Sequence, residues 1–413
     1  MERGKKLIKT TREIDNLISK HKGYRERSLN LIASENYSSE KVRGYLGCDL
    51  GNRYGCYSTL DPSDREYTGN KYIHEVEMAT QDLVKDIFKA KYADLRPIGG
   101  HLAGMSVVLA LLEPGDLVIE VSLADWGHGL VGPMCELRQF DETIRVEYMK
   151  FTEDRAVDTE KLIEQAKALK PKMIIFGGSG TLFEEPVREL RQLADEQGFY
   201  IAYDAAHVTG LIAGGLFKNP LEEGADIMFG STHKSFPGPQ GGFVVSNNKD
   251  LITKVGDALS PSLVTSHHLN RLPALAASIL EMKEFGKEYA EQFVKNSKAL
   301  AKALDEYGFD VLGKNKGFTD SHLILVNLGD MIKEAPAKYL EKANILVSDD
   351  FSGGSPEVRI GTPEVTRRGL KEEDMKDIAT FIKRLLMDNE DPEKVRGDVE
   401  LYTKNFSGIE YSF

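Results

Sequence analysis

The sequence predicts an α/β fold built on a mainly parallel sheet in a large domain, followed by a smaller α+β domain at the carboxyl end. The first observation is a series of short apolar runs that alternate with charged, helix-like stretches. Strands that alternate with helices form parallel sheets covered on both faces. The second observation is a change in the sequence pattern after residue 307, where several strand-like runs follow one another. The predicted strands of the large sheet are residues 116–121, 172–176, 199–203, 226–230 and 242–245.

The remaining elements follow from helical spacing and turn signals along the chain. Residues 5–28 carry apolar side chains at helical spacing, which predicts an arm that packs on another surface or on its own domain. Two helical patterns between 80 and 112 flank a turn at 96–100, and a long helix is predicted over 272–307. The smaller domain has predicted strands at 309–312, 322–326, 345–347 and 358–360 and a closing helix at 372–387. A chain of 413 residues exceeds one compact core, and we expect an amino-terminal segment (1–50), a large domain (51–272) and a linking helix with the small domain (273–413).

Charge and cysteine usage narrow the class of protein. The 53 Lys and Arg residues against 65 Asp and Glu give a formal net charge of −12, which argues against nucleic acid as the main partner. Cys48, Cys56 and Cys135 are too few and too scattered for a disulfide framework or a cysteine-rich metal site. There is no apolar signal core and no apolar run of about 20 residues that could span a membrane. We therefore expect a cytoplasmic enzyme with no metal centre.

A lysine and an aspartate each close a predicted buried strand. Asp204 ends the run at 199–203, and Lys234 follows the run at 226–230. Ligands of open α/β sheets bind at the carboxyl ends of the strands. A lysine amine that forms a Schiff base, with a carboxylate that pairs with a pyridinium nitrogen, is what pyridoxal phosphate requires. Either residue alone is better explained as a helix cap or a solvated lysine, but together with His207 and the glycine-rich turn at 238–242 they favour the cofactor.

A phosphate site is predicted at a glycine turn earlier in the chain. Gly99, Gly100 and His101 follow a proline and precede a helix-like run, so their backbone amides can hold a phosphate at a helix amino terminus. A lone glycine pair is a weak signal. It gains weight from the lysine and aspartate described above.

Four motifs, in order along nearly the whole chain, resemble those of the serine hydroxymethyltransferase family. They are the segments 31–36 (Leu-Ile-Ala-Ser-Glu-Asn), 125–128 (Asp-Trp-Gly-His), 203–211 with 231–234 (Ser-Thr-His-Lys), and 359–369. The resemblance implies a pyridoxal-phosphate transferase of fold type I, the aspartate-aminotransferase-like fold. It implies serine and glycine as substrates, a pterin as one-carbon acceptor, and a homodimer with the active site at the subunit interface.

The resemblance also implies roles for single residues. Lys234, Asp204 and His128 would be catalytic, with His128 stacked on the pyridine ring, which holds the ring plane for bond alignment. Ser34, Tyr67 and Arg359 would bind the substrate, and a guanidinium suits a carboxylate because it binds in a bidentate way. Arg367 and Arg368 are expected to be structural residues or surface charges. The implied cofactor contacts are Gly99, Gly100, His101, His128, Ser179, Asp204, His207, His233, Lys234 and Tyr54, of which Tyr54, like Tyr67, would reach in from the neighbouring subunit.

The chain departs from the family around the one-carbon carrier. The family's glutamate is replaced by Cys56, whose thiol is mostly protonated near neutral pH and a weak hydrogen-bond partner. Glu66 stands before Tyr67 and would return a carboxylate to the same cavity. The family's glycine pair that meets the phosphate of the adjacent subunit is replaced by Ser266 and His267, and we interpret the adjacent histidines His267 and His268 as phosphate or substrate contacts and not as metal ligands. Glycines and His101 stand where the family has small hydroxyl residues on the phosphate, Gln240 replaces an arginine, and the segment 348–357 is shorter than the family's pterin loop.

Three functions remain open on the sequence alone. The first is serine hydroxymethyl transfer to a pterin. The second is a pterin-independent aldolase, transaldolase or other pyridoxal-phosphate reaction on a β-hydroxy or α-substituted amino acid, which Cys56 and the short segment favour. The third is a non-catalytic binding protein, which the joint presence of Lys234 and Asp204 argues against, since packing requires neither.

Overall fold

A seven-stranded sheet dominates the part of the chain that the computed structural model describes, residues 8–136, 144–329, 331, 335–349 and 356–413. The strand order is β2-β8-β7-β6-β5-β3-β4. The strands from β7 to β4 run parallel, whereas β8 is antiparallel to both of its neighbours. The strands are β2 (Tyr92–Asp94), β3 (Leu117–Glu120), β4 (Arg145–Tyr148), β5 (Met173–Phe176), β6 (Tyr200–Asp204), β7 (Ile227–Ser231) and β8 (Gly242–Ser246).

Alternate residues of these strands enter two apolar cores, one on each face of the sheet. In β6, Ile201 and Tyr203 belong to one core and Ala202 belongs to the other, as the two-residue period of a strand requires. The first core is completed by α3 (Lys71–Ile87), α6 (Thr159–Leu169), α7 (Val187–Gln197), α8 (Thr209–Ala213), α9 (Pro220–Glu223) and α11 (Arg271–Glu306). The second is completed by α4 (Gly100–Leu111), α5 (Val131–Glu136) and α10 (Lys249–Leu259). Burial on both faces explains why the strands read as continuous apolar runs.

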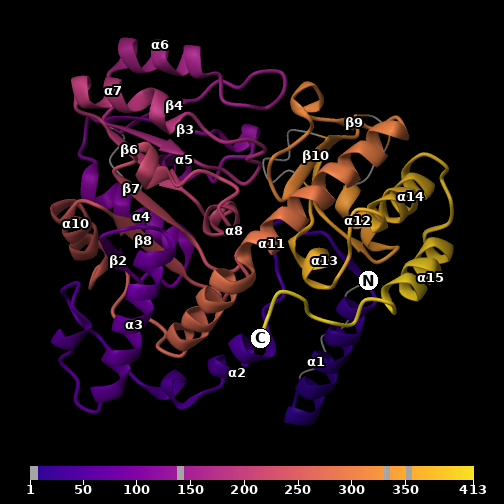
Figure 1. Cartoon of the computed structure of the whole chain (residues 1–413), viewed down its shortest axis with the longest axis horizontal. Coiled ribbons are helices and arrows are strands. Elements are labelled where there is room, and N and C mark those ends of the chain that lie inside the picture. Colours follow the sequence, from indigo (N-terminus) through magenta and orange to yellow (C-terminus); the bar gives the residue numbers. More distant parts are fainter. Residues whose placement is uncertain (1–7, 137–143, 330, 332–334, 350–355) are drawn as a thin grey trace.

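The long helix α11 joins this unit to a smaller one. Its first part packs into the core of the large sheet, and Leu300, Ala301 and Leu304 near its end pack into a separate core. Figure 1 shows α11 running diagonally between the two lobes. The smaller lobe has an antiparallel sheet in the order β12-β13-β10-β9. Its elements are β9 (Asp310–Val311), β10 (Leu323–Asn327), α12 (Pro336–Glu341), β12 (Ser348–Asp349), β13 (Glu357–Gly361), α13 (Pro363–Arg367), α14 (Asp374–Leu386) and α15 (Pro392–Thr403).

The amino-terminal segment leaves an apolar stripe uncovered. Helix α1 (Thr11–Glu26) begins with a capping box between Thr10 and Glu13, and none of its residues is buried. Leu17 and Ile18 are 51% and 63% exposed, and α1 projects from the lower edge of the small lobe in Figure 1. The stripe therefore does not pack on its own protomer. The chain continues through β1 (Leu29–Asn30), which pairs in parallel with β11 (Ile345–Leu346), and α2 (Glu40–Leu46).

Most predicted elements are confirmed, and the corrections concern edges and long-range pairing. The predicted strands of the large sheet, the long helix and the closing helix all form within a few residues of their predicted bounds. The edge strands β2 and β4 and the helix α15 were not predicted. The run at 345–347 pairs with β1 and does not join the small sheet. The boundaries at 50 and 272 stay a prediction. None of the helices in the described ranges combines the length and apolarity that a membrane crossing needs.

Candidate active site

Lys234 and Asp204 lie at the carboxyl ends of neighbouring parallel strands. Asp204 is opposite Phe229 in the register of β6 and β7, and the Ala205 N–H donates to the Phe229 carbonyl at 2.7 Å. Asp204 is buried and accepts the N–H of Ala206 at 2.9 Å. Burial lowers the pKa of Lys234 to about 8, with a further lowering by Arg359 and an opposing effect of Asp204. The amine is thus much closer to its nucleophilic, neutral form than an ordinary lysine.

Two histidines extend from Asp204 toward the start of α4. The Nδ1 atom of His128 lies 3.6 Å from Oδ2 of Asp204, and Nε2 of His128 lies 3.0 Å from Nδ1 of His101. The two rings are stacked at a centroid distance of 5.2 Å. Burial, and then His128, lower the pKa of His101. The predicted residues His128, His101 and Asp204 are therefore brought together in one protomer.

The turn before α4 is shaped as a cradle for an anion. Gly99 is the N-cap residue of α4 and Gly100 its first residue, so the first N–H groups of this helix lack partners within the helix. A Cβ at Gly100 would come within 2.2 Å of Oγ of Ser231. The absence of a side chain at Gly100 lets the turn approach Ser231 at the end of β7. Ser231 lies three residues before Lys234.

Arg359 comes to the same site from the small lobe. It is buried on β13, and its guanidinium donates to the Ser179 carbonyl at 2.7 Å and to Oγ of Ser348 at 3.2 Å. It lies over the ring of Trp126, 5.2 Å from the centroid. Burial lowers the pKa of Arg359 to about 10, so it stays charged at neutral pH. A buried, charged guanidinium near Lys234 suits a carboxylate ligand.

Ser34 lies in a turn fixed against β13 and against the lysine loop. The Gly361 N–H donates to the Leu31 carbonyl at 2.8 Å, and a Cβ at Gly361 would come within 2.4 Å of the Cα atom of Ala33. On the other side, Nδ2 of Asn36 donates to the Lys234 carbonyl at 2.8 Å. Asn36 thus ties the predicted carboxylate-binding turn to the backbone of the lysine, a role that sequence reasoning missed.

Two buried histidines, His207 and His322, and the half-buried His233 surround this centre and are neutral near pH 7. Burial lowers the pKa of His233 to about 4 and of His322 to about 3, and it lowers the pKa of His207 well below its usual range. The rings of His207 and His322 stack at 5.8 Å. The Nδ1 atoms of His207 and His233 are buried without a hydrogen-bond partner. Such nitrogens can serve the polar groups of a bound cofactor. His322 was not predicted.

The two predicted tyrosines lie together on the surface. The rings of Tyr54 and Tyr67 are 4.9 Å apart, and both residues are exposed. Among the described residues, neither shares a recorded hydrogen bond with Lys234 or Asp204. Cys56 is half-buried, and Glu66 is exposed. Most of the segment 348–357, read as a shortened pterin loop, falls outside the described residues.

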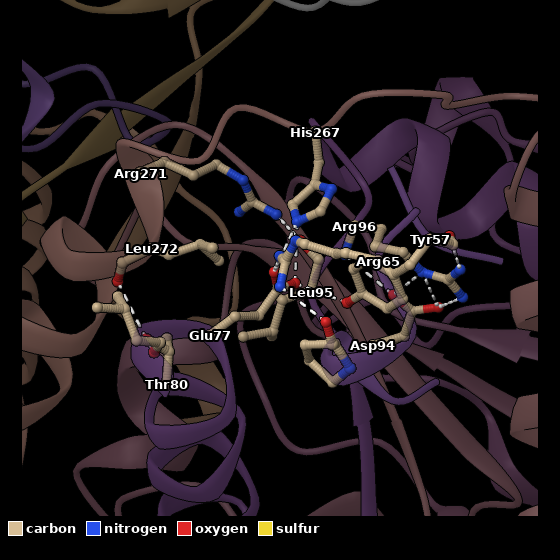
Figure 2. Close-up of polar contacts among 12 residues, drawn as sticks. Tyr57, Arg65, Glu77, Thr80, Asp94, Leu95, Arg96, His267, Arg271 and Leu272 are labelled. Atoms are coloured by element: carbon tan, nitrogen blue, oxygen red, sulfur yellow. Dashed lines mark hydrogen bonds and ion pairs between the residues drawn. The ribbon is translucent and has the colours of Figure 1, made fainter. Parts of the chain in front are cut away.

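Figure 2 shows that His267 belongs to a polar network of its own chain, which is buried. Its Nε2 atom lies 2.9 Å from the carboxylate of Glu77. The same carboxylate accepts the Tyr57 hydroxyl at 2.7 Å and a short hydrogen bond from Arg65. The interpretation of His267 as a phosphate or substrate contact is corrected accordingly, because its acceptor lies within its own core. Arg367 is fully buried against Glu281 and backbone carbonyls, as expected for a structural residue.

The set of groups fits pyridoxal phosphate. An amine with a lowered pKa, a buried carboxylate on the adjacent strand, a glycine cradle and buried histidine nitrogens without partners are present at one edge of the sheet. Each matches one part of the cofactor: aldehyde, pyridinium nitrogen, phosphate and ring substituents.

Comparisons with known proteins agree with this fit. The family model described as serine hydroxymethyltransferase matches residues 7–382. Relatives named serine hydroxymethyltransferase include one from Pyrococcus furiosus, 40% identical over 96% of both chains, and one from Methanocaldococcus jannaschii, 40% identical over 96% of this chain and 94% of the relative. A crystal structure of L-threonine transaldolase from Pseudomonas fluorescens in its internal aldimine state superposes with a TM-score of 0.90. It is 30% identical and covers 97% of this chain and 93% of that chain.

Proposed function

Since the chain belongs to the serine hydroxymethyltransferase family, a group of pyridoxal-phosphate enzymes, we propose that it converts serine and a pterin to glycine and a one-carbon-loaded pterin. The reaction breaks the bond between Cα and Cβ of serine, and the reverse reaction makes it. The observation that carries the proposal is the convergence of Lys234, Asp204 and Arg359 at one edge of the sheet. Bound pyridoxal phosphate supplies the electron sink for the electron pair left on Cα.

The residues of the chain divide the work by their chemistry. Lys234 holds the cofactor aldehyde, and its lowered pKa favours the neutral amine that this requires. Asp204 keeps the pyridinium nitrogen protonated by charge pairing, and its burial strengthens that pairing. His128 lies beside Asp204 and is assigned to the face of the ring. Arg359 and Ser34 hold the substrate carboxylate and so orient the Cα bonds for cleavage.

A direct experiment tests the reaction and the acceptor together. Purified protein is incubated with serine, with and without tetrahydrofolate, and glycine and formaldehyde are measured. Tetrahydrofolate-dependent formation of glycine is the expected result. Serine cleavage that is indifferent to any pterin would refute the pterin as partner. Cys56→Glu, with Cys56→Ser as the matched control, should raise the tetrahydrofolate-dependent rate if the thiol limits the carrier site.

A transaldolase reaction on threonine is the second candidate. It is favoured by Cys56 in place of the family's glutamate and by the structural likeness to an L-threonine transaldolase. Threonine with an added aromatic aldehyde is the distinguishing substrate pair. Formation of a new β-hydroxy amino acid and acetaldehyde, without a pterin, would favour this candidate over hydroxymethyl transfer.

We further propose that two copies form the active unit, with Tyr54 and Tyr67 facing the partner's cofactor. Their exposure and mutual contact support this, as does the apolar stripe of α1, whose residues are not buried within the chain. The cysteines form no disulfide, which is consistent with the proposed cytoplasmic location. Co-expression of Lys234→Ala and Tyr54→Ala chains should restore activity through one intact site per mixed dimer.

A further inference from the structure

The backbone just before the phosphate cradle is held by one buried arginine. Arg271 begins α11 and is 2% exposed. Its guanidinium donates to the Pro97 carbonyl at 3.0 Å, to the Leu95 carbonyl by a shorter bond, and to the Gly242 carbonyl at 3.4 Å. Figure 2 shows Arg271 and His267 approaching the segment of Leu95 and Arg96 from the same side. Arg271 thus joins the strand exit at 95–97 to the first residue of β8.

Arg96, which is part of this segment, forms a second set of hydrogen bonds with residues outside it. Its guanidinium pairs with Asp94 at 2.6 Å and donates to the carbonyls of Tyr57 and Ser58, each at 3.2 Å. Segment 95–97 therefore has side-chain hydrogen bonds in two directions, two residues before Gly99. These hydrogen bonds restrict the movement of the backbone of segment 95–97 relative to the sheet.

Close contacts at Gly241 and Gly242 fix the position of Arg271 relative to the turn at 99–101. A Cβ at Gly241 would come within 2.2 Å of Nη1 of Arg271, and a Cβ at Gly242 would come within 2.4 Å of the Gly99 carbonyl oxygen. The Gly242 N–H donates to the Pro97 carbonyl at 3.0 Å. The turn at 99–101 is therefore seated directly on the start of β8, which Arg271 holds in place.

The geometry requires an arginine and excludes a simple replacement by lysine. The three backbone carbonyls are divided between two nitrogens of the guanidinium, Nη1 for Gly242 and Nη2 for Leu95 and Pro97, whereas a lysine would present all of its donors on one nitrogen. Burial lowers the pKa of Arg271 to about 10, while Glu77 and Asp94 favour its charged form. The side chain therefore remains a cation at neutral pH, with a buried charge next to the cofactor turn.

We propose that Arg271 is the positioning residue of the phosphate cradle, and that it fixes the backbone N–H groups at 99–101 on which phosphate binding in this chain depends. The dependence arises because Gly99 and Gly100 offer no side-chain donor, and the ring of His101 lies against His128. Backbone donors bind an anion well only when they are already in place, since ordering them on binding would reduce affinity. The inference concerns the cofactor and does not depend on which amino acid or acceptor the enzyme uses.

The experiment compares binding of pyridoxal phosphate with binding of pyridoxal, which lacks the phosphate. Apoprotein is titrated with each compound, and the dissociation constants are obtained from the absorbance of the lysine adduct. Arg271→Lys should weaken pyridoxal phosphate at least tenfold and leave pyridoxal within twofold. The matched control is Arg367→Lys, another fully buried arginine that donates to backbone carbonyls, for which the ratio of the two constants should stay within twofold of wild type.

A second variant keeps the test decisive if Arg271→Lys does not fold. Gly241→Ala presses on the same guanidinium without removing its charge and should weaken pyridoxal phosphate selectively, by a smaller factor. In wild type, added inorganic phosphate should tighten pyridoxal binding, and Gly241→Ala should reduce this effect. A ratio unchanged in both folded variants, or an equal change in Arg367→Lys, would overturn the proposal. The test measures only cofactor binding. Its result can therefore be interpreted even if the protein does not turn over serine.

Discussion

Replacing Glu77 by glutamine should cost the protein about 3 kcal/mol of stability at neutral pH. Burial alone would raise the pKa of Glu77, but His267, Arg65 and Tyr57 outweigh it and lower the pKa from 4.5 to about 2. A carboxyl group shifted this far on folding contributes about 3 kcal/mol when ionised, at roughly 1.4 kcal/mol per pH unit. The glutamine also leaves Arg65 without its charged partner, and breaking a buried pair costs about 3 to 5 kcal/mol by itself.

The sign of the pH dependence gives a second readout. Because the folded-state pKa lies below the unfolded value, the stabilisation is complete above about pH 4.5 and is lost as the pH falls toward 2. Urea unfolding followed by far-ultraviolet circular dichroism, at neutral pH and at two acidic values, measures both effects. Glu75→Gln, on the exposed side of the same helix, should change stability by no more than about 0.5 kcal/mol. Equal stability of Glu77→Gln and wild type, with equal loss in acid, would refute the reasoning.

Three further predictions concern the site and the assembly. Reconstitution of apoprotein with pyridoxal phosphate should accelerate as the pH rises, with a midpoint near 8, because the pKa of Lys234 is lowered to about 8; a stopped-flow midpoint near 10.5 would contradict this. Arg359→Lys should raise KM for serine roughly 100-fold through loss of about 2 to 3 kcal/mol of bidentate pairing, and steady-state kinetics with an unchanged KM would rule out the assigned role. Leu17→Glu with Ile18→Glu should shift the proposed dimer to monomer in analytical ultracentrifugation, whereas an unaltered dimer would show that the stripe of α1 is not part of the interface.

The parts of the fold that the sequence predicted are those with local signals. The strands β6 and β7 are mostly apolar because both of their faces are buried, and each ends in a polar residue, Asp204 or Ser231, that marks its limit. The strand β4 is an edge strand with mostly exposed side chains, so it lacks that apolar signature. The pairing of β11 with β1 joins residues more than 300 positions apart, and no local pattern encodes such a partner.

The same division applies to the site. Lys234 and Asp204 follow predicted strands, so their placement could be anticipated from the strand ends, whereas the glycine turn at 99–100 was predicted from the proline before it and the helix-like run after it. Asn36 binds the lysine backbone from a distant segment. His267 looked like an anion ligand because its partner Glu77 is 190 positions away. The roles of these side chains depend on tertiary contacts. Such contacts leave no periodic pattern in a single sequence.

The chain has a single tryptophan, and its position makes it a native optical probe. Trp126 is buried in a small apolar cluster that includes Leu182 from the large lobe and Leu323 from the small lobe. Its indole N–H donates to Glu357 at 2.7 Å, and its ring lies under Arg359. Intrinsic fluorescence of the unlabelled enzyme should therefore report ligand engagement at that guanidinium and any rearrangement of one lobe against the other, without an added dye.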